Sequence, residues 1–140
     1  MSCECRNKSF LTHSITINPK SYFMKNFEQL KIWQKGFNIA VNAIKLTAGF
    51  LQEQKFGLGL QISRAAVSIP SNIAEGSSRS SKKDYNRFIE ISLGSSFELD
   101  TQLLIAKAVN FGQKDLTEFL LKEIDEEQKM LMSFMSKLHQ

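Results

Sequence analysis

Histidine is scarce in this sequence of 140 residues, which contains only His13 and His139. A serine or cysteine nucleophile needs a nearby base, usually histidine, and both histidines lie near a chain end. Neither has a glutamate three positions before it, which excludes the Glu-x-x-His pairs of di-iron bundles. The sequence also lacks a glycine-rich phosphate loop. We therefore assign no catalytic residue and expect no enzymatic activity.

Cysteine is equally scarce, since Cys3 and Cys5 are the only two. Two thiols one residue apart do not make a zinc site, and no second cluster completes one, so we expect no metal and no cofactor. Residues 1–24 lack the apolar core of a signal peptide, and no apolar run reaches the roughly 18 residues of a membrane span. We expect a cytoplasmic protein that does not enter a membrane.

Proline occurs only twice, and the sequence from Phe27 onward lacks any stretch that alternates like a strand. Residues 1–24 show no sustained periodicity and contain Pro19, which indicates a flexible N-terminal extension. Residues 25–140 then form one domain. Within it, the apolar residues recur every three or four positions, which predicts helices.

Four helical stripes follow one another along this domain. The first comprises Leu30, Trp33, Phe37, Ala40, Ile44 and Ala48. The second comprises Leu58, Ile62, Ala65, Ile69 and Ile73. The third comprises Tyr85, Phe88, Ile89, Ser92, Ser96, Leu99, Leu103 and Ala106. The fourth comprises Leu116, Leu120, Ile124, Glu127, Leu131, Phe134 and Leu138, apolar at all but one position. Short connections between four helices predict an all-α, antiparallel up-down-up-down bundle.

The second helix contains the segment QISRAAVSIPSNIAEG, from Gln61 to Gly76. Pro70 removes the hydrogen bond to the carbonyl of Ala66, so we expect a kink there. The third helix begins after Ser81, a predicted N-cap, and contains the small residues Gly94, Ser95 and Ser96. Small residues inside a long helix often mark a close approach of another backbone, for which the turn at Pro70 is the candidate.

The charge is divided between the two halves of the domain. Residues 25–90 contain ten Lys and Arg against five Asp and Glu, whereas residues 91–140 contain five against eight. The candidate phosphate-binding residues surround the turn between the second and third helices: Arg64, Arg79, Lys82, Lys83 and Arg87. Nothing among them would read base edges, so we expect salt-sensitive binding with little sequence preference.

The carboxylates allow two further interpretations. Glu123 and Glu126 have the spacing of a magnesium site, which Glu98 would complete, but their acidic neighbours favour a solvated helix face. Glu75 and Glu98 instead suggest a hydrogen-bonded polar link between the second and third helices.

The sequence resembles a known family in two stretches. These are FEQLKIWQKG from Phe27 and GLGLQISRAAVSIPSNIAEGSSRSSKKDYNRFIEISLGSSFELDTQL from Gly57 to Leu103. Both are similar to the 23S rRNA intervening sequence proteins, also called four-helix bundle proteins. The resemblance implies a bundle that assembles as a homopentamer. A related branch, the accessory variability determinant proteins of diversity-generating retroelements, implies nucleic-acid binding on a basic surface. The signature positions are Pro70, Ser71, Asn72, Glu75, Gly76, Arg87, Gly94 and Glu98, and the family gives none of them a catalytic role.

Three functions remain open at this point. The first is a non-enzymatic accessory protein that binds RNA or DNA. The second is a protein-interaction scaffold whose basic and acidic halves meet partner surfaces. The third is a carboxylate-metal hydrolase that uses Glu98, Glu123 and Glu126.

Overall fold

Helices make up most of the chain that the structure, a computed structural model, describes from residue 26 to residue 140. Four are long: α1 (Lys31–Ala48), α3 (Leu60–Ser77), α4 (Lys82–Ala108) and α5 (Lys114–Leu138). The 3-10 turn η1 (Phe27–Gln29) precedes α1, and α2 (Gln52–Gln54) with the π-helical turn η2 (Lys55–Gly59) joins α1 to α3. Residues 26–140 contain no strand, so the predicted all-α class is confirmed. The expected extension, residues 1–24, lies outside the described range.

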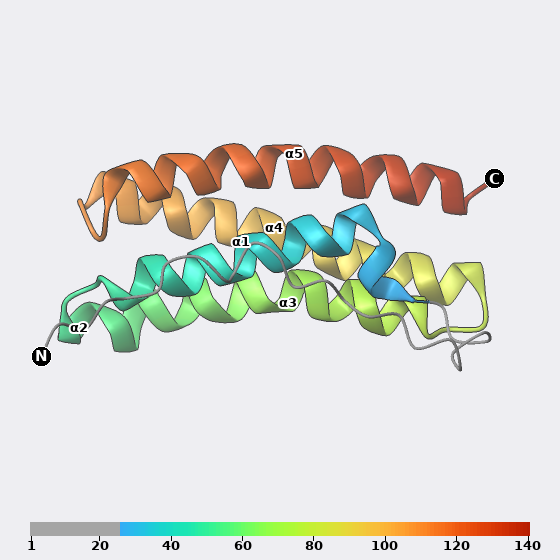
Figure 1. Cartoon of the computed structure of the whole chain (residues 1–140), viewed down its shortest axis with the longest axis horizontal. Coiled ribbons are helices and arrows are strands. Elements are labelled where there is room, and N and C mark those ends of the chain that lie inside the picture. Colours follow the sequence, from blue (N-terminus) through green and yellow to red (C-terminus); the bar gives the residue numbers. More distant parts are fainter. Residues whose placement is uncertain (1–25) are drawn as a thin grey trace, which may run out of the picture.

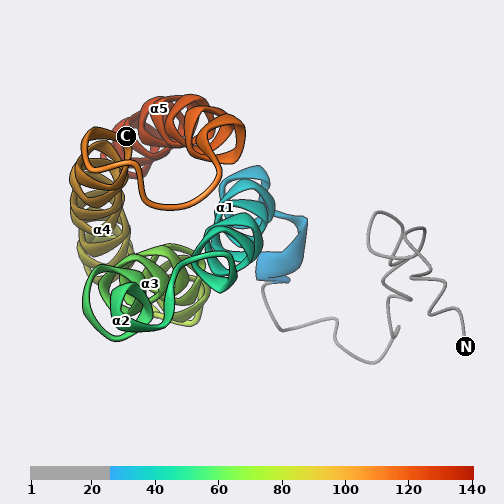
Figure 2. The same cartoon turned by 90° about the vertical axis from the view of Figure 1, so that its left-hand side faces the viewer.

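The four long helices run alternately up and down along one axis (Figure 1). Each packs on the next in sequence, and α1 also packs on α5, which closes the bundle. Figure 2 shows the four helices at the corners of a square when the bundle is viewed from one end. The predicted up-down-up-down topology is therefore confirmed. Within residues 26–140, no helix combines the length and apolar character that crossing a membrane requires.

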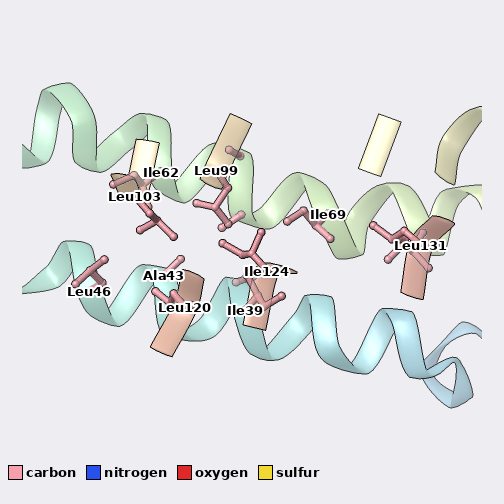
Figure 3. Close-up of a cluster of buried hydrophobic side chains, with 14 of the residues drawn as sticks. Ile39, Ala43, Leu46, Ile62, Ile69, Leu99, Leu103, Leu120, Ile124 and Leu131 are labelled. Carbon is pink, nitrogen blue, oxygen red and sulfur yellow. The ribbon is translucent and has the colours of Figure 1, made fainter. Parts of the chain in front are cut away.

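The core runs along the middle of this square (Figure 3). Most of the predicted stripes of the second, third and fourth helices lie in it. The fully buried members include Ile62, Ile69, Ile73, Ile89, Leu99, Leu103, Leu120, Ile124 and Leu131. Leu58, Leu116, Phe134 and Leu138 are partly buried against this cluster. The three-four spacing thus located the buried face of α3, α4 and α5.

The buried face of α1 differs from the predicted stripe. Phe37 and Ile44 are 46% and 48% exposed, whereas Ile39 and Leu46 are buried. Trp33 is partly buried and stacks on Phe37 with the ring centroids 5.1 Å apart. Both sets of apolar residues recur every three or four positions, so periodicity alone could not decide which set faces the core. α1 therefore presents a second apolar face to the outside.

The chain enters α3 through the π-helical turn η2, in which Gly57 has non-helical angles (φ −92°, ψ −105°). Pro70 lies inside α3, but it does not interrupt the helix, which continues to Ser77. The non-helical angles thus occur before α3, and the kink expected at Pro70 stays a prediction.

Gly76 permits the closest packing between α3 and α4. A Cβ atom at this position would lie 2.8 Å from Phe88 Cβ and 2.9 Å from the Tyr85 ring. Contacts under about 3 Å are repulsive, so any larger side chain would push the start of α4 away from the end of α3. By contrast, a Cβ atom at Gly94 would meet nothing within 4 Å. The sequence predicted a close approach of another backbone near Gly94, but nothing else in residues 26–140 lies against that glycine.

Replacing the two glycines should have opposite effects. Gly76→Ala should lower the free energy of unfolding by roughly 1 to 3 kcal/mol, because it overpacks the α3–α4 contact. Gly94→Ala should raise it by up to about 1 kcal/mol, since alanine favours an open helix position. Urea denaturation of both variants tests this difference. Equal losses of stability in the two variants would contradict the packing described for Gly76.

Candidate nucleic-acid interface

The turn between α3 and α4 carries Arg79 at its surface. Ser81 caps α4, since its Oγ accepts a 3.1 Å hydrogen bond from the backbone N–H of Asp84, as the sequence predicted. Arg79 donates to Glu75 Oε1 at 2.9 Å, and its guanidinium carbon lies 4.6 Å from the centre of the Phe88 ring. The arginine is thus held over an aromatic face while it remains open to solvent.

Three more cations follow Arg79 on the first turns of α4. The side chains of Lys82, Lys83 and Arg87 are exposed, and none has a hydrogen bond or an ion pair within residues 26–140. Lys82 and Lys83 are the first two residues of α4, where the helix dipole disfavours positive charge. Two cations at this position destabilise the isolated helix, and a bound anion would offset that effect. We call Arg79, Lys82, Lys83 and Arg87 the basic turn cluster.

Arg64, the fifth predicted cation, lies away from this cluster. It precedes Ser77, the last residue of α3, by 13 positions, which corresponds to about 20 Å along a helix. Ser68 of α3 is paired with Ser95 of α4, so Arg64, one turn before Ser68, lies level with Glu98. The predicted patch is therefore divided, and Arg64 does not belong to the turn.

A polar link joins α3 and α4 near Pro70. The hydroxyls of Ser68 and Ser95 lie 2.8 Å apart, and Asn72 Nδ2 donates to Ser68 Oγ at 2.9 Å. Deeper in the core, Ser92 Oγ donates a 2.8 Å hydrogen bond to the main-chain carbonyl of Ile69. Ser92 is fully buried, so α4 contacts the backbone of α3 directly, one residue before the proline.

The predicted link through Glu75 and Glu98 is wrong. Glu75 pairs with Arg79 four residues along its own helix, and Glu98 accepts from Gln102 Nε2, also in its own helix, at 3.1 Å. Both glutamates are exposed. A carboxylate on the outer surface keeps its hydration, whereas the shorter serine and asparagine side chains fit between the two helices.

Glu123 and Glu126, the residues of the alternative magnesium site, pair with a cation of the chain itself. Lys35 Nζ lies 2.8 Å from Glu123 Oε2 and 2.7 Å from Glu126 Oε2. Burial lowers the pKa of Lys35, but the hydrogen bonds and charges of both glutamates outweigh it, so the pKa is raised. The hydrogen bond from Lys35 in turn lowers the pKa of Glu126. Within residues 26–140, no cluster of three His, Cys, Asp or Glu side chains forms a metal-binding group.

Glu127, the polar member of the fourth stripe, is fully buried. Neither carboxyl oxygen has a hydrogen-bond partner among the described residues. Burial raises the pKa of Glu127 to about 8, against a smaller opposing influence of Lys35. Glu127 therefore lies on the face that its place in the stripe predicts, because its register on α5 follows Ile124 and Leu131 into the core.

The family model for the 23S rRNA-intervening sequence protein matches residues 28–133, which cover all four long helices except the last turn of α5. The chain belongs to this family. A solved structure with the same fold is a protein of unknown function from the S23 ribosomal protein family of Bacteroides thetaiotaomicron. It is 26% identical, with a TM-score of 0.69, and the match covers 74% of this chain and 97% of that one. No curated protein matches the chain.

Several signature positions of the intervening sequence family make contacts within the bundle. Asn72 donates to Ser68 within α3, Gly76 packs against α4, and Ser71 Oγ donates to the carbonyl of Val67 at 2.8 Å. Pro70 is buried, and Gly94 is exposed on the outer face of α4. One residue of interest, the buried Ser92, was not among the predicted sites. Ser92 carried a signal, because it occupies a core position of the third stripe.

The Ser92 hydrogen bond should contribute measurably to stability. Ser92→Ala removes the donor to the Ile69 carbonyl and leaves a small space in the core, so the free energy of unfolding should fall by about 1 kcal/mol or slightly more. Thr101→Ala is the matched control, since Thr101 Oγ1 bonds only to Phe97 in its own helix and is exposed. Thermal unfolding of both variants is the measurement. A Ser92→Ala variant as stable as Thr101→Ala would contradict the role of this link.

Proposed function

We propose that this protein is a non-enzymatic, cytoplasmic accessory protein that assembles from identical copies and binds the phosphate backbone of RNA or DNA. The basic turn cluster supplies the phosphate contacts, and sequence recognition is weak. The assembly is a homopentamer, as the family resemblance implies. The observation that carries the proposal is the set of unpaired cations at the start of α4.

The charges around the turn support phosphate binding. Lys82, Lys83 and Arg87 have no partner within residues 26–140, whereas Lys35 at the middle of the bundle is neutralised by two glutamates. The free cations also lie beside the positive end of the α4 dipole, where an anion gains from both. A phosphate chain crossing this end of the bundle would release counterions and offset the repulsion among these side chains.

The outer surface of α4 supports the assembly. Four large apolar side chains there are between 44% and 52% exposed: Ile91, Phe97, Leu104 and Ile105. The opposite face of α4 lies in the core, so the helix is apolar on two sides. A helix that is apolar all round is normally buried all round. Contact with another copy would cover this surface.

A protein-interaction scaffold is the second candidate, and the same apolar surface favours it. In that case the charges at the turn would contact a subunit or partner protein rather than phosphate. The two functions differ in what a charge substitution disturbs, namely nucleic-acid affinity or the assembly itself.

Neutralising the cluster should weaken nucleic-acid binding. The triple variant Lys82→Gln, Lys83→Gln, Arg87→Gln should lose affinity for a short fluorescent RNA or DNA. The slope of log K against log salt concentration should fall by about two to three units, because three phosphate contacts are lost. Fluorescence anisotropy at several salt concentrations measures both quantities.

The matched control removes the same charge from other exposed sites, with the substitutions Lys55→Gln, Lys114→Gln and Lys122→Gln. It should keep most of the native affinity and salt slope. Equal losses in the two triple variants would show only a response to net charge and would contradict a localised interface. A smaller assembly with unchanged affinity per copy would favour the scaffold.

A further inference from the structure

Glu127 lies where α1 packs closely against α3. A Cβ atom built on Gly36 of α1 would lie 3.3 Å from Glu127 Oε1, 3.1 Å from Ile69 Cγ2 and 3.5 Å from the nitrogen of Pro70. The missing side chain of Gly36 therefore gives the carboxyl group its space. Through this gap, α5 reaches the contact between α1 and α3 beside the proline.

The carboxyl group has no donor within reach. Neither oxygen of Glu127 accepts a hydrogen bond from any described residue, and the side chain is 0% exposed. An ionised carboxylate without donors or solvent is strongly unfavourable in a protein interior. A protonated carboxyl avoids this penalty, because it can donate a hydrogen bond of its own.

Pro70 creates an acceptor in the same layer. Proline has no backbone N–H, so the carbonyl of Ala66, one turn earlier in α3, lacks its helical donor. Ala66 is fully buried, so bulk water does not reach its carbonyl to supply the missing hydrogen bond. In an α-helix this carbonyl points along the axis toward residue 70, and the Pro70 nitrogen borders the same Gly36 gap as Glu127 Oε1.

We propose that Glu127 is a proton-dependent lock, whose protonated carboxyl donates to the Ala66 carbonyl and whose ionisation loosens α5 from α1 and α3. The lock is independent of nucleic-acid binding and of assembly. A single hydrogen bond then satisfies both the carboxyl group and the carbonyl, which otherwise have no partner in the core.

The charges that face Glu127 give the direction of the response. From α1 the facing cation is Lys35, which already binds Glu123 and Glu126, and from α5 itself the facing anion is Glu123. The neighbours on α3 are Ile69 and Pro70, and the α4 residue bonded to Ile69 is Ser92, none of which titrates at these pH values. An ionised Glu127 therefore finds no free cation.

The pH dependence follows from the raised pKa of Glu127. Its folded pKa of about 8 lies above the ordinary value of 4.5, so the folded protein holds a proton that the unfolded chain releases. The stabilisation is complete below the lower pKa and is lost as the pH rises through the higher one. The unfolding equilibrium constant should rise by up to about tenfold per pH unit between roughly pH 5 and 8.

Three variants test the lock by urea denaturation across this pH range. Glu127→Gln keeps a donor but cannot ionise, so its unfolding constant should lose the native rise with pH. Glu126→Gln, which alters the exposed neighbour, should keep that rise. A native-like rise in Glu127→Gln, or a native protein without the rise, would overturn the proposal. The infrared band of a protonated carboxyl should be present in the native protein at pH 6 and absent from Glu127→Gln.

The acceptor is tested separately with Glu127→Met, which removes the donor at similar size. Restoring the backbone N–H with Pro70→Ala should make this substitution less damaging than it is beside the proline. A double-mutant cycle measures the difference. Additive effects of Glu127→Met and Pro70→Ala would overturn the assignment of the Ala66 carbonyl as the acceptor.

Discussion

The close packing of α3 on α4 is the constraint on which the rest of this bundle depends. Gly76 brings the end of one helix against the Phe88 and Tyr85 side chains of the other, and Ser92 reaches the backbone of α3 in the core. Further along, Ser68 and Ser95 fix the register of the pair. Each contact requires a small side chain, so these serine and glycine positions serve the packing of the two helices.

This packing also determines where the charges lie. The turn between α3 and α4 is short and lies at one end of the bundle (Figure 1). The basic turn cluster therefore belongs to that end, around the N-terminus of α4. The middle of the bundle is different, since Lys35, Glu123 and Glu126 neutralise one another there. Glu127 belongs to the acidic half of the sequence, but burial favours its neutral form. This half therefore carries less negative charge in the folded protein than its composition indicates.

Much of the fold could be predicted from periodicity, but individual sites could not. Ile62, Ile69 and Ile73 lie on the face of α3 that the spacing predicts to be buried. α1 has two apolar faces, and which of them is buried depends on how the other helices pack. Arg64 was grouped with the turn because it is near it in sequence. In the helix, however, the 13 positions between Arg64 and Ser77 correspond to about 20 Å. Glu127 stood in an apolar stripe, but its acidic neighbours suggested solvent. Only the positions of Gly36 and Pro70 reveal the space that it fills.

The most direct test of the proposed function is the mass of the native protein, measured by light scattering during size-exclusion chromatography with and without a short structured RNA. We expect a mass near five times the 15.9 kDa of one chain, which increases with RNA at low salt and returns to its starting value at moderate salt. A single-chain mass, or an assembly whose mass does not change with RNA at low salt, would contradict the account.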